Sequence, residues 1–182
     1  MTILVSGFDT FESIVRNPSK ELVNRLDGSR IGSKTIVGAV LDVTYRAVRE
    51  ELFPLIRGVR PELILCFGVA ASRQHVEIES IARYRPDSRA DTIGECWWET
   101  EGPSLQSTAS VAAIAGAFDA RVSEDAGSYV CNATLYSVLR AFPGIATCFV
   151  HIPLDGMAPE RVLDGLSALS HSEGKSRWMK KV

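Results

Sequence analysis

The sequence predicts an α/β protein of a single domain, an α/β/α sandwich in which a largely parallel, mixed central sheet lies between two layers of helices. Two observations predict this fold. Short apolar runs of strand length alternate along the chain with segments of helical periodicity, which is typical of layered α/β domains. The length of 182 residues suits one domain with its own core. We expect the domain to span residues 1–182, with a flexible tail over 171–182.

The first half of the chain supplies three buried strands and two helices. Apolar runs at 3–5, 35–41 and 63–67 are expected to be strands covered on both faces. A helix is predicted to begin at Asn17-Pro18, where Asn caps and Pro takes the first helical position, and to run to about Leu26. The next helix should cover roughly 44–56, with Pro54 disturbing its last turn.

The second half begins with two segments that break this pattern. Residues 76–82 alternate with period two, which predicts an exposed or edge strand carrying Glu77 and Glu79 on one face. Residues 83–103 lack periodicity and predict a long irregular loop of the kind that is either functional or mobile. The remaining expected elements are helices over 104–118, 129–142 and 159–169 and a buried strand over 146–152.

Composition excludes several classes of protein. The 46% hydrophobic and 23% charged residues are ordinary for a soluble globular chain. A net charge of −2 provides no basic field for nucleic acid. No apolar run reaches membrane-spanning length, and residues 1–7 resemble a first strand rather than a secretory signal. We therefore expect neither a nucleic acid nor a membrane as partner.

The four cysteines, Cys66, Cys96, Cys131 and Cys148, are scattered without a Cys-x-x-Cys pair. Cys66 and Cys148 lie within apolar runs. This pattern favours reduced thiols in a cytoplasmic protein over a disulfide framework or a zinc site. We expect no metal and no cofactor.

Cys131 is the first candidate for chemistry, because it follows Gly127-Ser128 in the first turn of the helix predicted over 129–142. The helix dipole there lowers the pKa of a thiol, and the unpaired first-turn amides can receive an oxyanion. A cysteine on an amphipathic helix is, however, more often a packing residue. Taken alone, Cys131 leaves both roles open.

A cysteine nucleophile needs a base and a group that orients the base. His151 ends the strand predicted over 146–152, at the edge where open α/β sheets bind ligands; a buried structural histidine is the alternative. His75 starts the alternating strand, and His171 lies in a polar tail. Glu77 or Glu79 could orient an imidazole or simply be solvated.

Several motifs resemble the pyroglutamyl peptidase I (pyrrolidone-carboxylate peptidase) family. Residues 127–132 with Leu135-Tyr136 resemble its nucleophile motif, and 149–153, Phe-Val-His-Ile-Pro, resembles its Ile-His-Val-Pro motif. The likeness extends over most of the chain. It also includes 6–11 with Asn17-Pro18-Ser19, Arg60-Pro61-Glu62 leading to Phe67-Gly68, and 79–82, Glu-Ser-Ile-Ala, against the family's Glu-Arg-Val-Ala.

The resemblance implies a thiol peptidase that removes N-terminal pyroglutamyl groups from peptides through a thioester. Cys131 would be the nucleophile, His151 the general base and later the acid, and Glu79 rather than Glu77 would orient the imidazole. It further implies a phosphorylase/hydrolase-like fold and a homo-oligomer, either dimer or tetramer.

The resemblance also implies a substrate pocket. Phe8 and Phe11 would sandwich the flat lactam ring, Tyr129 and Val130 would line the pocket, and Arg89 would support the oxyanion or the loop. A neutral lactam needs such apolar faces and a few amide partners rather than a charge clamp.

Departures from the family pattern concern the pocket walls and leave the three catalytic positions intact. They are Thr10 for proline, Glu12-Ser13 for Gly-Gly, Ser80 for arginine, Tyr84 for asparagine, and the segment 90–94. They keep two other readings open: a related thiol amidohydrolase acting on another small cyclic or N-acyl substrate, and a catalytically silent member of the family. The Trp97-Trp98 loop could close over substrate or mark a subunit contact.

Overall fold

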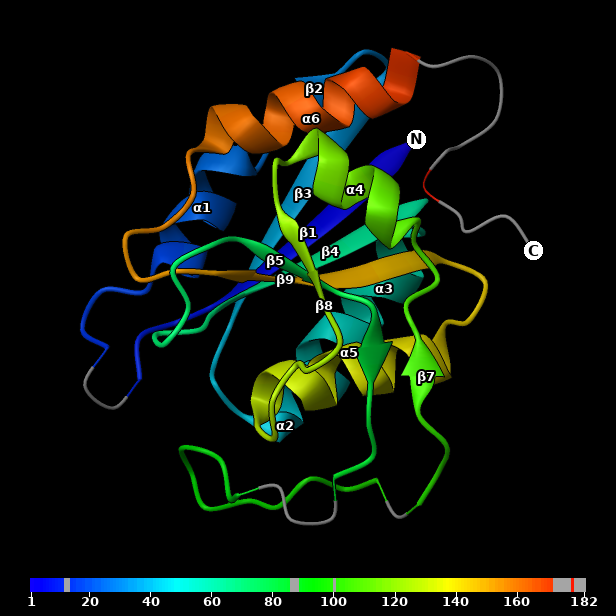
Figure 1. Ribbon diagram of the computed structural model, residues 1–182. Coiled ribbons are helices and arrows are strands. Elements are labelled where there is room, and N and C mark those ends of the chain that lie inside the picture. Colours follow the sequence, from blue (N-terminus) through cyan, green and yellow to red (C-terminus); the bar gives the residue numbers. More distant parts are fainter. Residues whose placement is uncertain (12–13, 86–88, 100, 172–177, 179–182) are drawn as a thin grey trace.

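The computed structural model describes residues 1–11, 14–85, 89–99, 101–171 and 178. At its centre lies a seven-stranded sheet of order β2-β3-β1-β4-β9-β5-β8 (Figure 1). The strands of this sheet are β1 (Thr2–Phe8), β2 (Arg30–Ile31), β3 (Lys34–Leu41), β4 (Leu63–Val69), β5 (Glu77–Glu79), β8 (Arg121–Ser123) and β9 (Ala146–Ile152). Two short strands, β6 (Ile81–Ala82) and β7 (Leu105–Gln106), pair separately.

The sheet is mixed and mostly parallel, as predicted. Strands β3, β1, β4 and β9 run parallel to one another. Strand β2 is antiparallel to β3, whereas β5 is antiparallel to β9 and parallel to β8. The carboxyl ends of β1, β4 and β9 therefore meet at one edge of the sheet.

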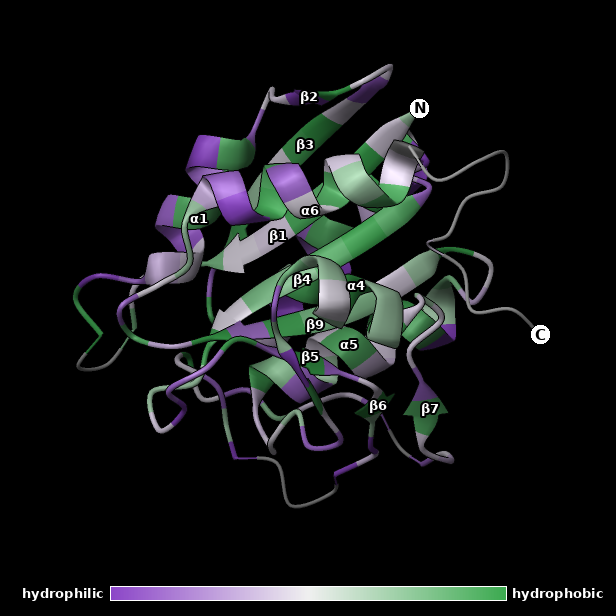
Figure 2. Ribbon diagram, turned by 45° about the horizontal axis from the view of Figure 1, so that its top comes forward, coloured by the Kyte–Doolittle hydropathy of each residue, from purple (hydrophilic) through white to green (hydrophobic). Residues whose placement is uncertain are grey.

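Helices cover both faces, so the α/β/α prediction is confirmed (Figure 1). One layer holds α1 (Pro18–Leu26), α4 (Val111–Ala117) and α6 (Pro159–His171), and the other holds α2 (Tyr45–Ala47), α3 (Phe53–Val59) and α5 (Val130–Ala141). Along β1, Ile3 and Val5 face the first layer and Leu4 faces the second. In Figure 2 the interior strands β4 and β9 are strongly hydrophobic, whereas α1 carries many hydrophilic residues.

Helix α1 forms as the sequence predicts. The side chain of Asn17 accepts a hydrogen bond of 3.0 Å from the amide of Ser19, and Pro18 occupies the first helical position. Leu22, Val23 and Leu26 are buried against the sheet.

The helix predicted over 44–56 is longer and is interrupted differently. The Thr44 side chain caps α2 by accepting from the amide of Ala47 at 3.1 Å, and a π-helical stretch, Val48–Leu52, leads into α3. Pro54 lies in the first turn of α3, where proline is tolerated, so the helix continues to Val59. The expectation that Pro54 disturbs a last turn is wrong.

The helix predicted over 104–118 is also wrong, because only its second half is helical. Hydroxyl groups in its first half bond the backbone of other segments instead. Ser107 donates to the carbonyl of Glu79 at 2.7 Å, and Thr108 donates to that of Ile145 at 2.6 Å. This competition between side chain and helix delays α4 to Val111.

Strand β5 lies inside the sheet, between β9 and β8, and is not an edge strand. Ile78 and Glu79 are both buried. The polar residue Glu79 is tolerated in this alternating segment because it bonds buried polar partners, not because its face of the strand is exposed to water.

The loop predicted over 83–103 has no helix or strand in its described part. Trp97 anchors it: the indole nitrogen donates to Ser137 Oγ at 3.3 Å, and the ring meets Tyr136 edge-on at 5.2 Å. Both partners are on α5. Trp97 is therefore a packing residue in this chain rather than an exposed contact.

The expected flexible tail lies outside the described residues, except for two positions. His171 ends α6. Trp178 is buried in the core, and its carbonyl accepts from the amide of Ser110 at 2.6 Å. None of the helices in the described part of the chain is both long and apolar enough to cross a membrane.

Candidate active site

A buried His–Glu pair lies where β9 meets β5. Antiparallel pairing sets Glu77 opposite His151 and Glu79 opposite Phe149. The Nδ1 atom of His151 is 2.7 Å from Oε1 of Glu79. The His151 side chain is 5% exposed and that of Glu79 is fully buried. This hydrogen bond fixes the ring and leaves Nε2 as the nitrogen for proton transfer.

The Glu79 carboxyl is held in its charged form. Burial alone would raise its pKa, but the hydrogen bond and charge of His151, with the nearby Ser123 hydroxyl and the hydrogen bond from Arg73, outweigh burial and lower the pKa below its ordinary value. A charged Glu79 stabilises an imidazolium at His151. Of the two glutamates, Glu79 is the one bonded to the imidazole.

Cys131 lies in the first turn of α5, as predicted. Tyr129 takes the cap position with extended backbone, and Gly127 adopts a left-handed φ of 81° that turns the chain into the helix. Asn132 anchors the turn: its amide group accepts from the nitrogen of Arg83 at 3.0 Å and donates to the carbonyl of Arg83 at 2.7 Å. Asn132 follows Cys131 in the motif, but no role for it was predicted from the sequence.

The expected lowering of the Cys131 pKa is wrong as a net direction. Burial, then the charge of Glu79 and the nearby Cys66 thiol, raise the pKa of Cys131 to about 12. Arg73 and the first-turn amide act in the opposite sense but are weaker. This direction favours the neutral thiol, which requires a base to become a nucleophile.

A cavity of about 290 Å³ brings the expected site residues together. Its lining includes Phe8, Phe11, Arg89, Tyr129, Val130, Cys131 and His151. Glu79 is absent from the lining because it lies behind His151. All eight residues singled out from the sequence thus belong to one site.

Aromatic rings form much of the cavity wall. Phe8 stacks on Phe149 with 6.5 Å between ring centres, and Phe149 is 4.8 Å from His151. Phe11 lies 6.4 Å from Tyr129, and the Arg89 guanidinium lies 3.9 Å above the Tyr129 ring. Phe8 thus supports the histidine side, while Arg89 stacks on the opposite aromatic wall.

Gly68, near the end of β4, allows the cysteine to approach the sheet. A Cβ atom there would lie 2.9 Å from the Cys131 sulfur and 2.7 Å from the Phe149 ring. Gly68 pairs with His151 in the β4–β9 register. The glycine is therefore needed for close approach, a role that the sequence pattern did not show.

The departures from the family pattern have local partners. Ser80 donates to the carbonyl of Ser123 at 2.9 Å, and Tyr84 packs on Trp97. The Asp91 carboxylate accepts from the amide of Tyr45 at 2.8 Å, which ties the 90–94 segment to the start of α2. Thr10 bonds Asp9 at the surface. Glu12 and Ser13 lie outside the described residues.

Arg73 was missed by sequence reasoning. It lines the same cavity, and its Nη1 atom is 2.6 Å from Oε1 of Glu79. It also forms an ion pair with Glu77 and donates to the carbonyl of Asp125 at 2.5 Å. No periodicity marks a single arginine in a turn, so the signal appears only in three dimensions.

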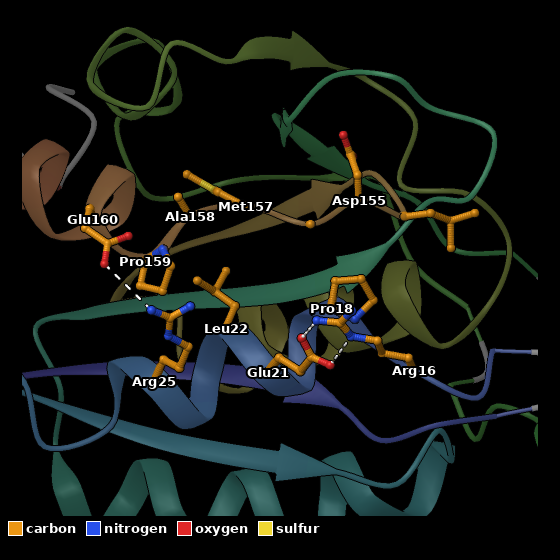
Figure 3. A pocket seen from close by; sticks show the side chains of 12 residues that line it. Arg16, Pro18, Glu21, Leu22, Arg25, Asp155, Met157, Ala158, Pro159 and Glu160 are labelled. Atoms are coloured by element: carbon orange, nitrogen blue, oxygen red, sulfur yellow. Dashed lines mark hydrogen bonds and ion pairs between the residues drawn. The ribbon is translucent and has the colours of Figure 1, made fainter.

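A second cavity, of about 410 Å³, lies between α1 and the segment that leads into α6 (Figure 3). Four of its charged side chains are paired with each other: Arg16 bonds Glu21 at 2.7 Å, and Arg25 is 3.8 Å from Glu160. It includes none of the three expected catalytic residues. In the part of the chain that is described, no group of three or more His, Cys, Asp or Glu residues is arranged to hold a metal ion.

Comparisons with known proteins show the family of this chain. The family model described as pyroglutamyl peptidase matches residues 1–172. The chain is 33% identical over 168 residues to a pyrrolidone-carboxylate peptidase of Cupriavidus pinatubonensis, covering 84% of this chain and 78% of that protein. It is 34% identical over 168 residues to one of Thermococcus onnurineus, covering 84% of each.

Solved structures share the fold. The pyroglutamyl peptidase I of Bacillus amyloliquefaciens superimposes with a TM-score of 0.78 at 26% identity, covering 91% of this chain and 90% of that one. The pyrrolidone carboxyl peptidase of Thermococcus litoralis gives a TM-score of 0.79 at 23% identity, with 91% and 90% coverage.

Proposed function

The chain belongs to the pyroglutamyl peptidase family of cysteine-type hydrolases, whose reaction removes N-terminal pyroglutamate from peptides, and we propose that Cys131, His151 and Glu79 carry out this reaction here. One observation carries the assignment of residues. The buried 2.7 Å bond between His151 and Glu79 lies directly behind a cavity that Cys131 also lines.

In the first half of the reaction, His151 Nε2 takes the proton of the neutral Cys131 thiol as the sulfur attacks the pyroglutamyl carbonyl carbon. The carbonyl oxygen becomes an oxyanion, which the first-turn amides of α5 are suited to receive. The C–N bond then breaks, and the proton on His151 passes to the leaving amine. A thioester on Cys131 remains.

In the second half, His151 takes a proton from water, and the hydroxide attacks the thioester carbonyl. The C–S bond breaks, pyroglutamate leaves, and the proton returns to the thiol. Throughout, Glu79 holds the imidazole tautomer with Nδ1–H directed at its carboxylate and stabilises the positive charge on the ring.

The cavity suits a neutral lactam. Phe11, Tyr129 and Val130 offer apolar surface, and Phe8 closes the side next to His151. Arg89 is stacked on Tyr129 and thereby positioned near the pocket. We propose that these five residues bind the pyroglutamyl group, which is uncharged and flat and needs contact more than ion pairing.

The proposed roles are tested with pyroglutamyl-aminocoumarin. Wild type should release the fluorophore, Cys131→Ala should abolish release, and His151→Ala should lower kcat by at least about 10²-fold. Cys96→Ala removes an exposed cysteine and is the matched control, with activity close to wild type. Acid quenching during turnover should trap a pyroglutamyl adduct on the peptide that contains Cys131. Turnover that persists in Cys131→Ala would contradict the assignment.

We further propose a cytoplasmic homo-oligomer, dimer or tetramer. Four free thiols support a reducing location. Strand β8 lies at an edge of the sheet, where unpaired backbone groups can pair with a second copy, and it exposes Val122 at 52%. Sedimentation equilibrium of the purified protein tests the oligomer, and a single species at the mass of one chain would contradict it.

A further inference from the structure

Arg73 connects two parts of the active site that come from distant segments. It follows β4 in a turn closed by a 2.9 Å hydrogen bond from its own amide to the carbonyl of Ala70. From there its side chain, 20% exposed, reaches both β5 and the segment before α5. No motif in the sequence assigned it a role.

One end of the guanidinium acts on the orienting carboxylate. Oε1 of Glu79 is 2.7 Å from Nδ1 of His151 and 2.6 Å from Nη1 of Arg73. The same oxygen therefore serves both partners. Since both donors converge on Oε1, the arginine holds the carboxylate in the rotation about its last bond that places this oxygen at the imidazole, while Oε2 is buried without a hydrogen-bond partner among the described residues.

The other end of the guanidinium acts on the nucleophile. Nη2 donates to the carbonyl of Asp125, just before the Gly127–Tyr129 turn that starts α5. Cys131 is in the first turn of that helix. One rigid side chain thus ties the position of the cysteine to that of the histidine–glutamate pair.

We propose that Arg73 is a positioning residue for the reaction: it holds Glu79 toward His151, holds the start of α5 at the cavity, and balances the carboxylates that face the histidine. The proposal rests on the proposed function for its kinetic test, and a second test is independent of substrate.

The charge balance gives the proposal a specific signature. Glu77 and Glu79 of β5 lie next to His151, and Cys131 of α5, Arg73 of the turn after β4 and Arg89 line the same cavity as His151. Removing the Arg73 charge leaves two carboxylates that favour a protonated imidazole. The neutral imidazole of His151, which acts as the base, would then form only at higher pH.

The kinetic experiment compares Arg73→Gln and Arg73→Lys with wild type on pyroglutamyl-aminocoumarin. Arg73→Gln should lower kcat about tenfold or more, change KM by less than about threefold, and move the acid limb of the kcat/KM profile to higher pH. Arg73→Lys keeps the positive charge but loses the planar guanidinium that bonds Glu79 and Asp125 together. It should therefore return the acid limb of the profile to its wild-type pH while recovering kcat only in part.

Two control variants separate the effects. The side chain of Arg83 donates to the carbonyl of Glu124, next to Asp125, and forms no hydrogen bond with Glu79 among the described residues, so Arg83→Gln should disturb the same segment without moving the acid limb. Glu77→Gln removes one of the carboxylates and should move the acid limb to lower pH, opposite to Arg73→Gln. Melting temperatures of all variants identify any loss of fold.

The substrate-independent experiment follows alkylation of Cys131 by iodoacetamide against pH, with peptide mapping. Slower alkylation with a profile moved to higher pH in Arg73→Gln, and a restored profile in Arg73→Lys, would support the proposal even if wild type did not cleave the pyroglutamyl substrate. The proposal is overturned if Arg73→Gln keeps the wild-type pH profiles. It is equally overturned if Arg83→Gln shifts them as much, or if the lysine variant restores nothing.

Discussion

Opposing influences act on the pKa of the Cys131 thiol, and their relative magnitudes decide whether it is protonated. The start of α5 and Arg73 favour the thiolate, whereas burial and Glu79 favour the thiol and raise its pKa to about 12. A dipole effect of the first helical turn is small compared with the removal of a charge from water. We therefore expect the thiolate to form by proton transfer during the reaction rather than to exist as a resting ion pair with His151.

This dependence on proton transfer gives a prediction for Glu79. Glu79→Gln keeps an acceptor for the Nδ1–H group but removes the negative charge that stabilises the imidazolium. We expect kcat to fall by about 10²-fold or more with KM little changed, because the charge acts only when His151 carries the proton. Steady-state kinetics measure this, with the exposed Glu50→Gln as control. A kcat within threefold of wild type would show that Glu79 is only structural.

At the level of residues, local patterns singled out Cys131, His151 and either Glu77 or Glu79 as candidates, and the choice of Glu79 came from the resemblance to the family. Cys131 follows a helix start, His151 ends a buried strand, and Glu79 is in an alternating segment. Arg73 has no such local signature. Its partners are Glu79, six residues away, and Asp125, 52 residues away, so only the fold brings them together.

At the level of elements, the periodicity of apolar residues predicted which segments are strands or helices better than it predicted which segments lie next to each other. It predicted the strands β1, β3, β4 and β9, the caps of α1 and the extent of α5. It failed for β5, because an alternating pattern does not distinguish a solvated face from one where Glu79 is buried by polar partners. It also failed for 104–110, where Ser107 and Thr108 bond other segments and so prevent helix.

The contact between β4 and α5 gives a second prediction. Gly68→Ala should push the Phe149 ring or the Cys131 sulfur aside, because the new methyl would lie under 3 Å from both. We expect unfolding free energy to fall by about 1–3 kcal/mol and kcat to fall at least about tenfold. Urea unfolding and steady-state kinetics measure the two effects.

The matched control is Gly58→Ala, in α3. A Cβ there meets nothing within 4 Å, and alanine in a helix is favoured by up to about 1 kcal/mol over glycine. It should therefore leave kcat unchanged and keep or increase stability. If both glycine variants behave alike, the proposed close approach at Gly68 is wrong.

At the level of the whole molecule, three cysteines share an unusual environment. Burial is the main cause that raises the pKa of Cys66 to about 11, that of Cys131 to about 12 and that of Cys148 still further. Two of them lie in the adjacent central strands β4 and β9. The interior of the sheet therefore disfavours thiolates as a group.

These thiols predict a loss of stability in alkali. Above pH 9, the ordinary pKa of a thiol, the unfolded chain releases thiol protons that the folded chain keeps. The unfolded state then binds fewer protons, and stability falls as pH rises, by up to about 1.4 kcal/mol per pH unit for each thiol. Urea unfolding between pH 8 and about pH 10.5 should show a shallower fall for Cys66→Ala than for wild type. The exposed Cys96→Ala should match wild type, and equal slopes for Cys66→Ala and wild type would exclude this cause.

Strand β5 also bears on how the protein acquires its activity during folding. The bond between His151 and Glu79 joins residues 72 positions apart, and β5 reaches β9 through only three residue pairs. The parallel pairing of β4 with β9 spans a still longer sequence separation but forms seven residue pairs, so the β5–β9 contact has fewer interactions to offset the entropy of closing its loop. We expect β5 to dock after the parallel strands have assembled, so a partly folded chain has Cys131 and His151 but no oriented base. The rate at which enzyme activity recovers during refolding then reports the docking of β5. Far-ultraviolet circular dichroism reports the earlier assembly of helices and parallel strands, so its signal should recover before the activity does.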